Sequence, residues 1–143
     1  MIFHFDEGSI SLPDGWKDQT INIISSTGGA QAGLTFTITR EEMPWGMQFD
    51  EYVDAELGKA GKALNDFTII DRKQVQISGN PAHQVECTWK AKQGLMHQII
   101  TTINQRNKAV VVTASSPAKM SETQKKQLME AVSTFRFLDR TGV

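Results

Sequence analysis

Apolar and polar residues alternate along most of this sequence, and this alternation constrains the fold more than any other feature. Between Leu34 and Thr39, leucine, phenylalanine and isoleucine are each followed by threonine. Successive side chains of a β-strand point to opposite faces, so this spacing predicts a strand with one apolar and one more polar face. The segments with strand character are 10–12, 20–25, 34–39, 68–77, 82–90, 96–104 and 109–115.

Proline and glycine separate these segments. Proline presets one backbone dihedral and glycine accepts a positive φ, so both residues favour turns. The strands on either side of the glycines at 28 and 29 are predicted to pair as a hairpin. The main turn signals are Pro13-Asp14-Gly15, Gly28-Gly29, Ser78-Gly79-Asn80-Pro81 and Gly94.

One segment after the first strands has the spacing of an α-helix. Apolar residues recur there every three or four positions, with acids in the first turns and lysines in the last, as the helix dipole favours. Gly58 and Gly61 lie inside this helix, where each costs about 1 kcal/mol relative to alanine. They indicate either close approach of another backbone or a weak helix that the sheet supports. The apolar positions are Phe49, Val53, Leu57, Ala60 and Leu64.

A second helix is predicted near the end of the chain. Ser121 and Gln124 have the spacing of a capping box, in which each side chain accepts a hydrogen bond from the other residue's backbone N–H. Its apolar stripe is Leu128, Met129, Val132 and Phe135.

This order of elements predicts an α+β fold. We expect a single domain over residues 1–143, with an antiparallel β-sheet of about six to seven strands packed with two main helices. Apolar residues make up 39% and charged residues 22% of the chain, a balance typical of soluble globular domains. The formal net charge of −1 gives no electrostatic basis for binding nucleic acid or anionic membranes.

Targeting signals are also missing from the sequence. The start of the chain lacks the basic region and apolar stretch of a secretory signal, and it has no lipid-anchor cysteine. No window approaches the roughly 18 apolar residues of a membrane helix, so direct membrane insertion is not expected. If Met1 is the natural start, the expected location is the cytoplasm.

Residues for catalysis or metal binding do not cluster in the sequence. The single cysteine, Cys87, lies in an apolar-alternating run and is expected to be a buried, inert thiol. His4, His83 and His97 lack metal-ligand spacing, so we predict no metal site and no cofactor. No combination of residues resembles a catalytic site, so no catalytic residue is assigned. An enzyme would require His83 or His97 to meet a carboxylate in a cleft.

The second face of the sheet carries the functional signal. In two strands the less apolar face still mixes isoleucine and methionine with amides and hydroxyls, at Asn22, Ile24, Met96, Gln98 and Ile100. Such a surface suits an apolar ligand that also has polar groups to hydrogen-bond. Alternatively, a helix or a second subunit covers it.

The sequence resembles the Eag chaperones, the effector-associated proteins of bacterial type VI secretion. The resemblance runs from about Phe5 to Phe137, and it rests on the order and spacing of several short motifs. These are Ile10-Ser11-Leu12-Pro13-Asp14-Gly15-Trp16-Lys17-Asp18-Gln19-Thr20, Leu34-Thr35-Phe36-Thr37-Ile38-Thr39-Arg40-Glu41, Phe49 with Tyr52-Val53, Gly79-Asn80-Pro81-Ala82, Trp89-Lys90, His97-Gln98 and Phe135.

The resemblance implies a PsbP-like fold, a homodimer shaped like a claw, and an adaptor rather than an enzyme. It implies that the partner is the N-terminal region of a cognate effector, with its transmembrane helices and PAAR domain. The adaptor would shield those helices in the cytoplasm and aid loading of the effector onto the spike. With the alternation, it predicts a client-binding face made of Asn22, Ile24, Ala60, Leu64, Met96, Gln98 and Ile100.

Two points stay open from the sequence. A small-ligand module that binds a lipid or similar amphiphile would use the same face. A deep closed pocket in one subunit would favour that module, whereas a long open groove across a dimer would favour the chaperone. The apolar loop Met43-Pro44-Trp45-Gly46-Met47 is predicted to be a dimer contact, a client contact or a lid.

Overall fold

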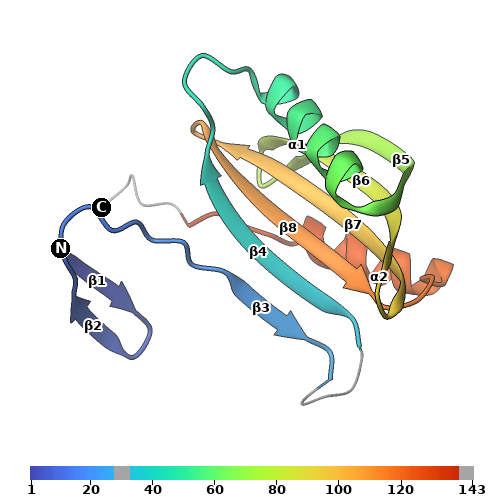
Figure 1. The fold of residues 1–143 in the computed structure, drawn as a ribbon, viewed down its shortest axis with the longest axis horizontal. Helices are drawn as coiled ribbons and strands as arrows, with labels where there is room; N and C mark the ends of the chain where they lie inside the picture. Colours follow the sequence, from blue (N-terminus) through green and yellow to red (C-terminus); the bar gives the residue numbers. More distant parts are fainter. Residues whose placement is uncertain (28–32, 139–143) are drawn as a thin grey trace.

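The computed structural model describes residues 1–27 and 33–138, and it has the predicted α+β architecture (Figure 1). A six-stranded antiparallel sheet has the strand order β3-β4-β8-β7-β6-β5, and a separate two-stranded hairpin joins β1 to β2. The elements are β1 Ile2–Phe5, β2 Gly8–Ser11, β3 Asn22–Ser25, β4 Thr35–Glu42, α1 Phe49–Ala63, β5 Asn65–Ile77, β6 Asn80–Ala91, β7 Gly94–Gln105, β8 Lys108–Ser116 and α2 Glu122–Ser133.

Strands β5 to β8 form a meander whose register is set by tight turns. Ile77 pairs with Asn80, and Gln105 pairs with Lys108, so two residues connect the strands in each case. The central residues of both turns have positive φ, including Arg106 at 51° and Asn107 at 65°. Such turns match the right-handed twist of the flanking strands. The predicted turn at 78–81 is confirmed at its first two residues, while Asn80 and Pro81 already belong to β6.

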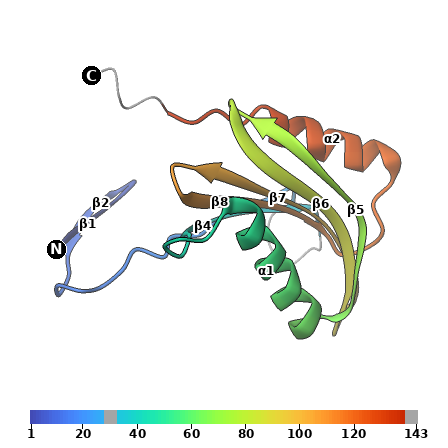
Figure 2. The ribbon, with the colours of Figure 1, turned by 90° about the horizontal axis from the view of Figure 1, so that it is seen from above.

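The two helices lie on opposite faces of the sheet, with α1 on the inner side of the curve of β5 and β6 (Figure 2). Helix α1 ends at Ala63, one residue earlier than predicted, and Leu64 caps it in an extended conformation. Ser121 and Gln124 form the predicted capping box at the start of α2. The six-stranded sheet is therefore covered by one helix on each side.

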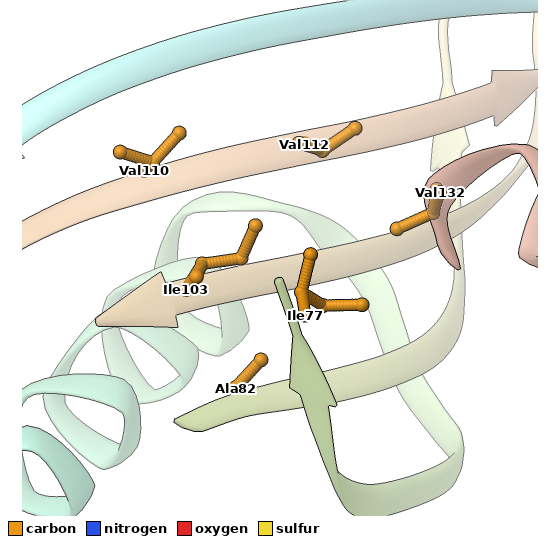
Figure 3. Close-up of a cluster of buried hydrophobic side chains, with 6 residues drawn as sticks. All are labelled: Ile77, Ala82, Ile103, Val110, Val112 and Val132. Carbon is orange, nitrogen blue, oxygen red and sulfur yellow. The ribbon is translucent and has the colours of Figure 1, made fainter. Parts of the chain in front are cut away.

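Most of the hydrophobic core lies between the sheet and α2 (Figure 3). Val132 of α2 packs there on side chains from four strands, and Leu128 packs on a neighbouring cluster with Ile99, Ala114 and Met120. Phe135 and Met129, the other predicted stripe residues, contact these clusters while staying half-buried. The residues of the first cluster are Ile77, Ala82, Ile103, Val110, Val112 and Val132.

The N-terminal region differs most from the sequence prediction. The predicted strand at 10–12 is the second half of a hairpin whose first strand, β1, the pattern did not reveal. This hairpin lies apart from the six-stranded sheet (Figure 1). Strand β3 begins at Asn22 instead of Thr20, and it pairs with β4 as predicted. The glycines at 28 and 29 lie outside the described residues.

Candidate binding site

A pocket of about 570 Å³ lies between α1 and the four inner strands of the sheet, β4, β8, β7 and β6. We call it the α1 pocket. Its lining combines apolar side chains with threonine hydroxyls, the mixture predicted for the second face of the sheet. Ile21, just before β3, forms its outer edge and is more than half exposed. The lining residues are Gln19, Thr20, Ile21, Thr39, Arg40, Glu41, Tyr52, Val53, Glu56, Leu57, Ala60, Val85, Ile100, Thr102, Val111 and Thr113.

The strand register shows how this surface continues beyond the pocket. Cross-strand neighbours share a face, and Ile100 is opposite Thr113, which is opposite Thr37, which is opposite Ile23. This row therefore reaches the edge strand β3, where the Ile23 side chain is 68% exposed. The α1 face of β3 and β4 thus presents isoleucine and threonine to solvent.

The structure divides the predicted client-binding residues between two faces. Ala60 and Ile100 line the α1 pocket. Met96 and Gln98 share the face of Ile100, because they lie four and two residues before it in β7. Leu64 is half-buried just after α1, on the same side of the sheet.

Asn22 and Ile24 lie on the other face. Asn22 is opposite Ile38 and Ile24 is opposite Phe36, and both partners pack into the core beneath α2. The neighbours Ile21 and Ile23, which the sequence prediction left out, are the β3-side residues on the α1 face. Ile24 pairs with Phe36, whose side chain faces the core. This pair is the signal that places Ile21 and Ile23 on the α1 face, because a shift by one residue reverses the face of a strand.

Gln98 is already hydrogen-bonded within the sheet. Its Nε2 donates to Ser115 Oγ at 3.0 Å, and its Oε1 accepts from Trp89 Nε1 at 2.9 Å. An amide can donate two hydrogen bonds and accept two, so one donor and one acceptor position remain. Any bond from Gln98 to a ligand therefore adds to a side chain that is already held in place.

Hydrogen bonds and an ion pair hold α1 over the sheet. The buried Tyr52 hydroxyl donates to Glu41 Oε2 at 2.7 Å, and Arg72 Nη2 pairs with Asp54 at 2.8 Å. Burial, followed by the hydrogen bond to Glu41, raises the pKa of Tyr52 above its usual range. The phenol therefore stays neutral. These contacts fix one wall of the α1 pocket.

The glycines of α1 lie on its exposed surface. A Cβ built on Gly58 meets no atom within 4 Å, and one built on Gly61 meets only Phe67 Cδ2 at 3.9 Å. Among the described residues, nothing in the chain makes a close approach at either position. The open surface at these glycines is available for a neighbouring molecule.

Two histidines do meet carboxylates, as the enzyme alternative required. His97 Nε2 lies 2.7 Å from Glu86 Oε2, and the Met120 N–H donates to Nδ1, so the ring proton is on Nε2. This pair is buried under α2, where it ties β6 and β7 to the start of that helix. His83 Nε2 lies 2.7 Å from Asp50 Oδ1, and both residues line a pocket of about 460 Å³. The Nδ1 atom of His83 is buried and has no hydrogen-bond partner among the described residues. Both arrangements connect elements of the fold.

Other reactive groups give little chemistry. Cys87 is fully buried, and burial raises the pKa of its thiol to about 11, as expected for an inert cysteine. Within residues 1–27 and 33–138, no three His, Cys, Asp or Glu side chains group in a way that would hold a metal ion. In the same ranges, neither helix has the length and apolar character needed to cross a bilayer.

The apolar loop between β4 and α1 is partly packed. Met43 and Met47 contact a cluster formed by Tyr52, Val53 and Ala109, whereas Trp45 between them is fully exposed. Gly46, with φ of 80°, allows the turn in which Met47 N–H donates to Pro44 O. The loop thus presents one tryptophan on a fixed turn, and its three predicted roles remain predictions.

Comparison with known proteins shows the family. The DcrB family model matches residues 7–134. The chain belongs to the DcrB family. Among curated proteins, this DcrB member is 27% identical to "Effector EagT6" of Pseudomonas aeruginosa strain PAO1 over 136 residues, which cover 92% of this chain and 94% of the relative. This finding is consistent with the resemblance to Eag chaperones.

Solved structures support the fold of this DcrB chain. The crystal structure of PA94 from Pseudomonas aeruginosa has a TM-score of 0.79, with 22% identity and coverage of 97% of both chains. The solution structure of cyanobacterial PsbP from Synechocystis has a TM-score of 0.53, with 12% identity, covering 88% of this chain and 83% of its own. The predicted PsbP-like fold is confirmed.

Proposed function

We propose that this chain is a chaperone and adaptor of type VI secretion, which binds and shields the N-terminal transmembrane helices of a cognate toxin effector. The mixed surface of the α1 pocket and its extension to β3 carries the proposal. A helix with apolar side chains and occasional polar groups would find matching partners there. The similarity to EagT6 supports an effector as the client.

The physical need for such a chaperone follows from the client. A transmembrane helix of about 20 residues exposes apolar surface in water at a cost of roughly 25 cal/mol per Å². The exposed Ile21 and Ile23 would cover part of this surface. The threonines beside them, such as Thr37 and Thr113, would satisfy polar groups that are costly to leave unpaired.

The proposed client-binding face is revised by the register. It consists of Ala60, Leu64, Met96, Gln98 and Ile100 from the sequence prediction, and we add Ile21 and Ile23. Asn22 and Ile24 would take part only with a client that reaches around the edge strand to the other face. The exposed Gly58 and Gly61 would let a client helix pack closely on α1, by the small-residue logic of membrane helices.

The finer features of the proposal come from the resemblance. The working form would be a homodimer in the cytoplasm, the bound region would include the PAAR domain, and the complex would load the effector onto the spike. No chemical step is assigned to the chain, since its role would be to bind and release.

A second candidate function is a small-ligand module. The volume of the α1 pocket, about 570 Å³, lies within the range of roughly 300–1,000 Å³ that is common for small-molecule sites. A lipid or similar amphiphile would then fill the pocket instead of a client helix. This candidate predicts that the purified chain carries such a molecule.

Co-expression with effectors from the same genome tests these functions. Each effector is produced with and without its N-terminal transmembrane region, and the complexes are purified through a tag on this chain. We expect capture only of effectors that keep the region. Capture of none, together with a bound lipid in native mass spectrometry, would replace the chaperone with the small-ligand module.

A further inference from the structure

The N-terminal hairpin has an apolar face that no described residue covers. Phe3 and Phe5 lie on one face of β1, with ring centroids 6.1 Å apart, and Ile10 of β2 is opposite Phe3 on that face. Phe5 and Ile10 are 48% and 51% exposed, and the hairpin lies apart from the six-stranded sheet (Figure 1). An isolated two-stranded hairpin is only marginally stable in water. This hairpin therefore needs a surface to pack on.

The hairpin is the end of a projecting arm, residues 1–17, because Asp18 to Ile21 already lie against the body of the molecule. The segment from 12 to 21 forms no helix or strand, and almost all of it is exposed. The Met1 amino group closes the hairpin onto this segment by donating to Leu12 O at 2.8 Å and pairing with Asp14 at 3.0 Å. Asp6 and Glu7 form the turn between β1 and β2, so the tip of the arm is acidic.

A pocket on the body of the molecule has the opposite character. Its volume is about 410 Å³, and Phe135 and Phe137 contribute apolar lining, with ring centroids 4.7 Å apart. Within the part of the chain that the structure describes, none of its cationic side chains forms an ion pair with a carboxylate. We call it the cationic pocket. Its cationic lining is Arg40, Arg106, Lys108 and Arg136.

We propose that the hairpin of one chain docks in the cationic pocket of a second copy, and that the hairpin of the second copy docks in the cationic pocket of the first. Phe5 and Ile10 would pack on Phe135 and Phe137, while Asp6 and Glu7 would pair with the arginines of the rim. The hairpin does not fill its own pocket, because Phe5 and Ile10 are exposed in the single chain. Exchange between two copies covers both surfaces of each chain at once, as two-fold symmetry requires.

Size and position agree with this assignment. A stable interface takes about 20–30 residues from each partner, and the arm of 17 residues together with the nine residues that line the pocket lies in that range. Val110 in the lining belongs to the core beneath α2, so the cationic pocket opens mainly on the face opposite the α1 pocket, and Arg40 at the edge lines both pockets. The exchange therefore leaves the α1 pocket open. The exchange rests on the homodimer of the proposed function, for which it supplies an interface, and it requires no client.

Charge reversal on the purified full-length chain tests the exchange. The arm variant is Asp6→Lys with Glu7→Lys, and the pocket variant is Arg106→Asp with Arg136→Glu. We expect a wild-type dimer in light scattering, and a dissociation constant at least about tenfold higher for each variant, because like charges then meet. A chain with all four substitutions is expected to regain most of the affinity.

A matched control separates this contact from a general charge effect. Lys92→Glu with Lys119→Glu makes the same net charge change as the pocket variant at exposed positions elsewhere, and it should leave the dimer unchanged. A wild-type monomer at about 100 µM would overturn the proposal, as would a dimer that neither reversal weakens. Failure of the four-substitution chain to recover would also overturn it. Client capture has no part in these measurements.

Discussion

At the scale of single residues, Ile23 and Ile24 show how position in a strand assigns a role. They are neighbours in β3 and are 68% and 58% exposed. Ile23 is opposite Thr37 on the α1 face, whereas Ile24 is opposite Phe36 on the α2 face. Two residues of the same type thus lie on different surfaces of the molecule. Their exposure means that substitutions at either one test binding more than folding.

The buried thiol of Cys87 gives a prediction for stability against pH. Burial raises its pKa from 9.0 to about 11, so the folded state favours the neutral thiol. This contribution is complete below pH 9 and is lost as the pH rises through 11. We expect the free energy of unfolding in urea to fall between pH 9 and 11, and Cys87→Ala to make that fall smaller. An equal fall in both proteins would contradict the assignment.

Tyr52 supports a second prediction. Tyr52→Phe removes the hydrogen bond to Glu41 and keeps the buried ring, so we expect the free energy of unfolding at neutral pH to drop by about 1 kcal/mol. Urea denaturation measures the change. Phe67→Leu, in a half-buried position near the other end of α1, is a comparison without a lost hydrogen bond. No loss of stability in Tyr52→Phe would show that the bond does not hold α1.

At the scale of elements, α1 has a surface that the described residues leave open. Its sheet side carries Tyr52 and Val53, which are buried. Its outer side exposes Gly58 and Gly61, and a methyl group fits at both positions. Glycine inside a helix lowers stability relative to alanine. The helix is thus less stable than the available space allows, as expected if a partner packs against it.

Alanine at these glycines separates stability from function. We expect Gly58→Ala to raise the free energy of unfolding by about 0.5–1 kcal/mol, since the helix gains propensity without a clash. The same variant should capture less client if a client helix packs closely there. Thermal denaturation and co-purification are measured on the same protein. Higher stability with unchanged capture would remove the glycines from the client-binding face.

The cap of α2 gives a prediction for the other helix. Ser121→Ala removes the hydroxyl that accepts from the Gln124 N–H, and we expect a loss of about 1 kcal/mol in urea denaturation. Ser133→Ala at the opposite end is the matched control, because Ser133 only donates to Glu130 O. Equal losses in the two variants would argue against a special role for the capping box.

Local signals in the sequence were enough to predict most of these helices and strands. The capping box and the alternation of Leu34–Thr39 predict their elements because the deciding contacts lie within a few residues. The face of β3 could not be predicted in this way. Isoleucines at 21, 23 and 24 fit either orientation, and pairing with β4 decides between them. The hairpin of β1 and β2 was missed because its apolar face does not pack on the sheet that the pattern describes.

At the scale of the whole molecule, the two faces of the sheet carry different features. The α2 face holds most of the core and the cationic pocket, and the α1 face holds the α1 pocket and its extension to β3. In this arrangement a second copy and a client would bind on opposite sides. The dimer would then present its client surfaces without covering them.

The most direct measurement is client capture by Ile23→Asp and Ile24→Asp. Each variant is co-expressed with an effector that the wild-type chain retains, and circular dichroism confirms that both are folded. We expect Ile23→Asp to lower the captured amount at least about tenfold, because it places a charge against an apolar helix. Ile24→Asp should capture as the wild type does. Equal capture by both variants, or a loss only in Ile24→Asp, would contradict a client-binding surface on the α1 face.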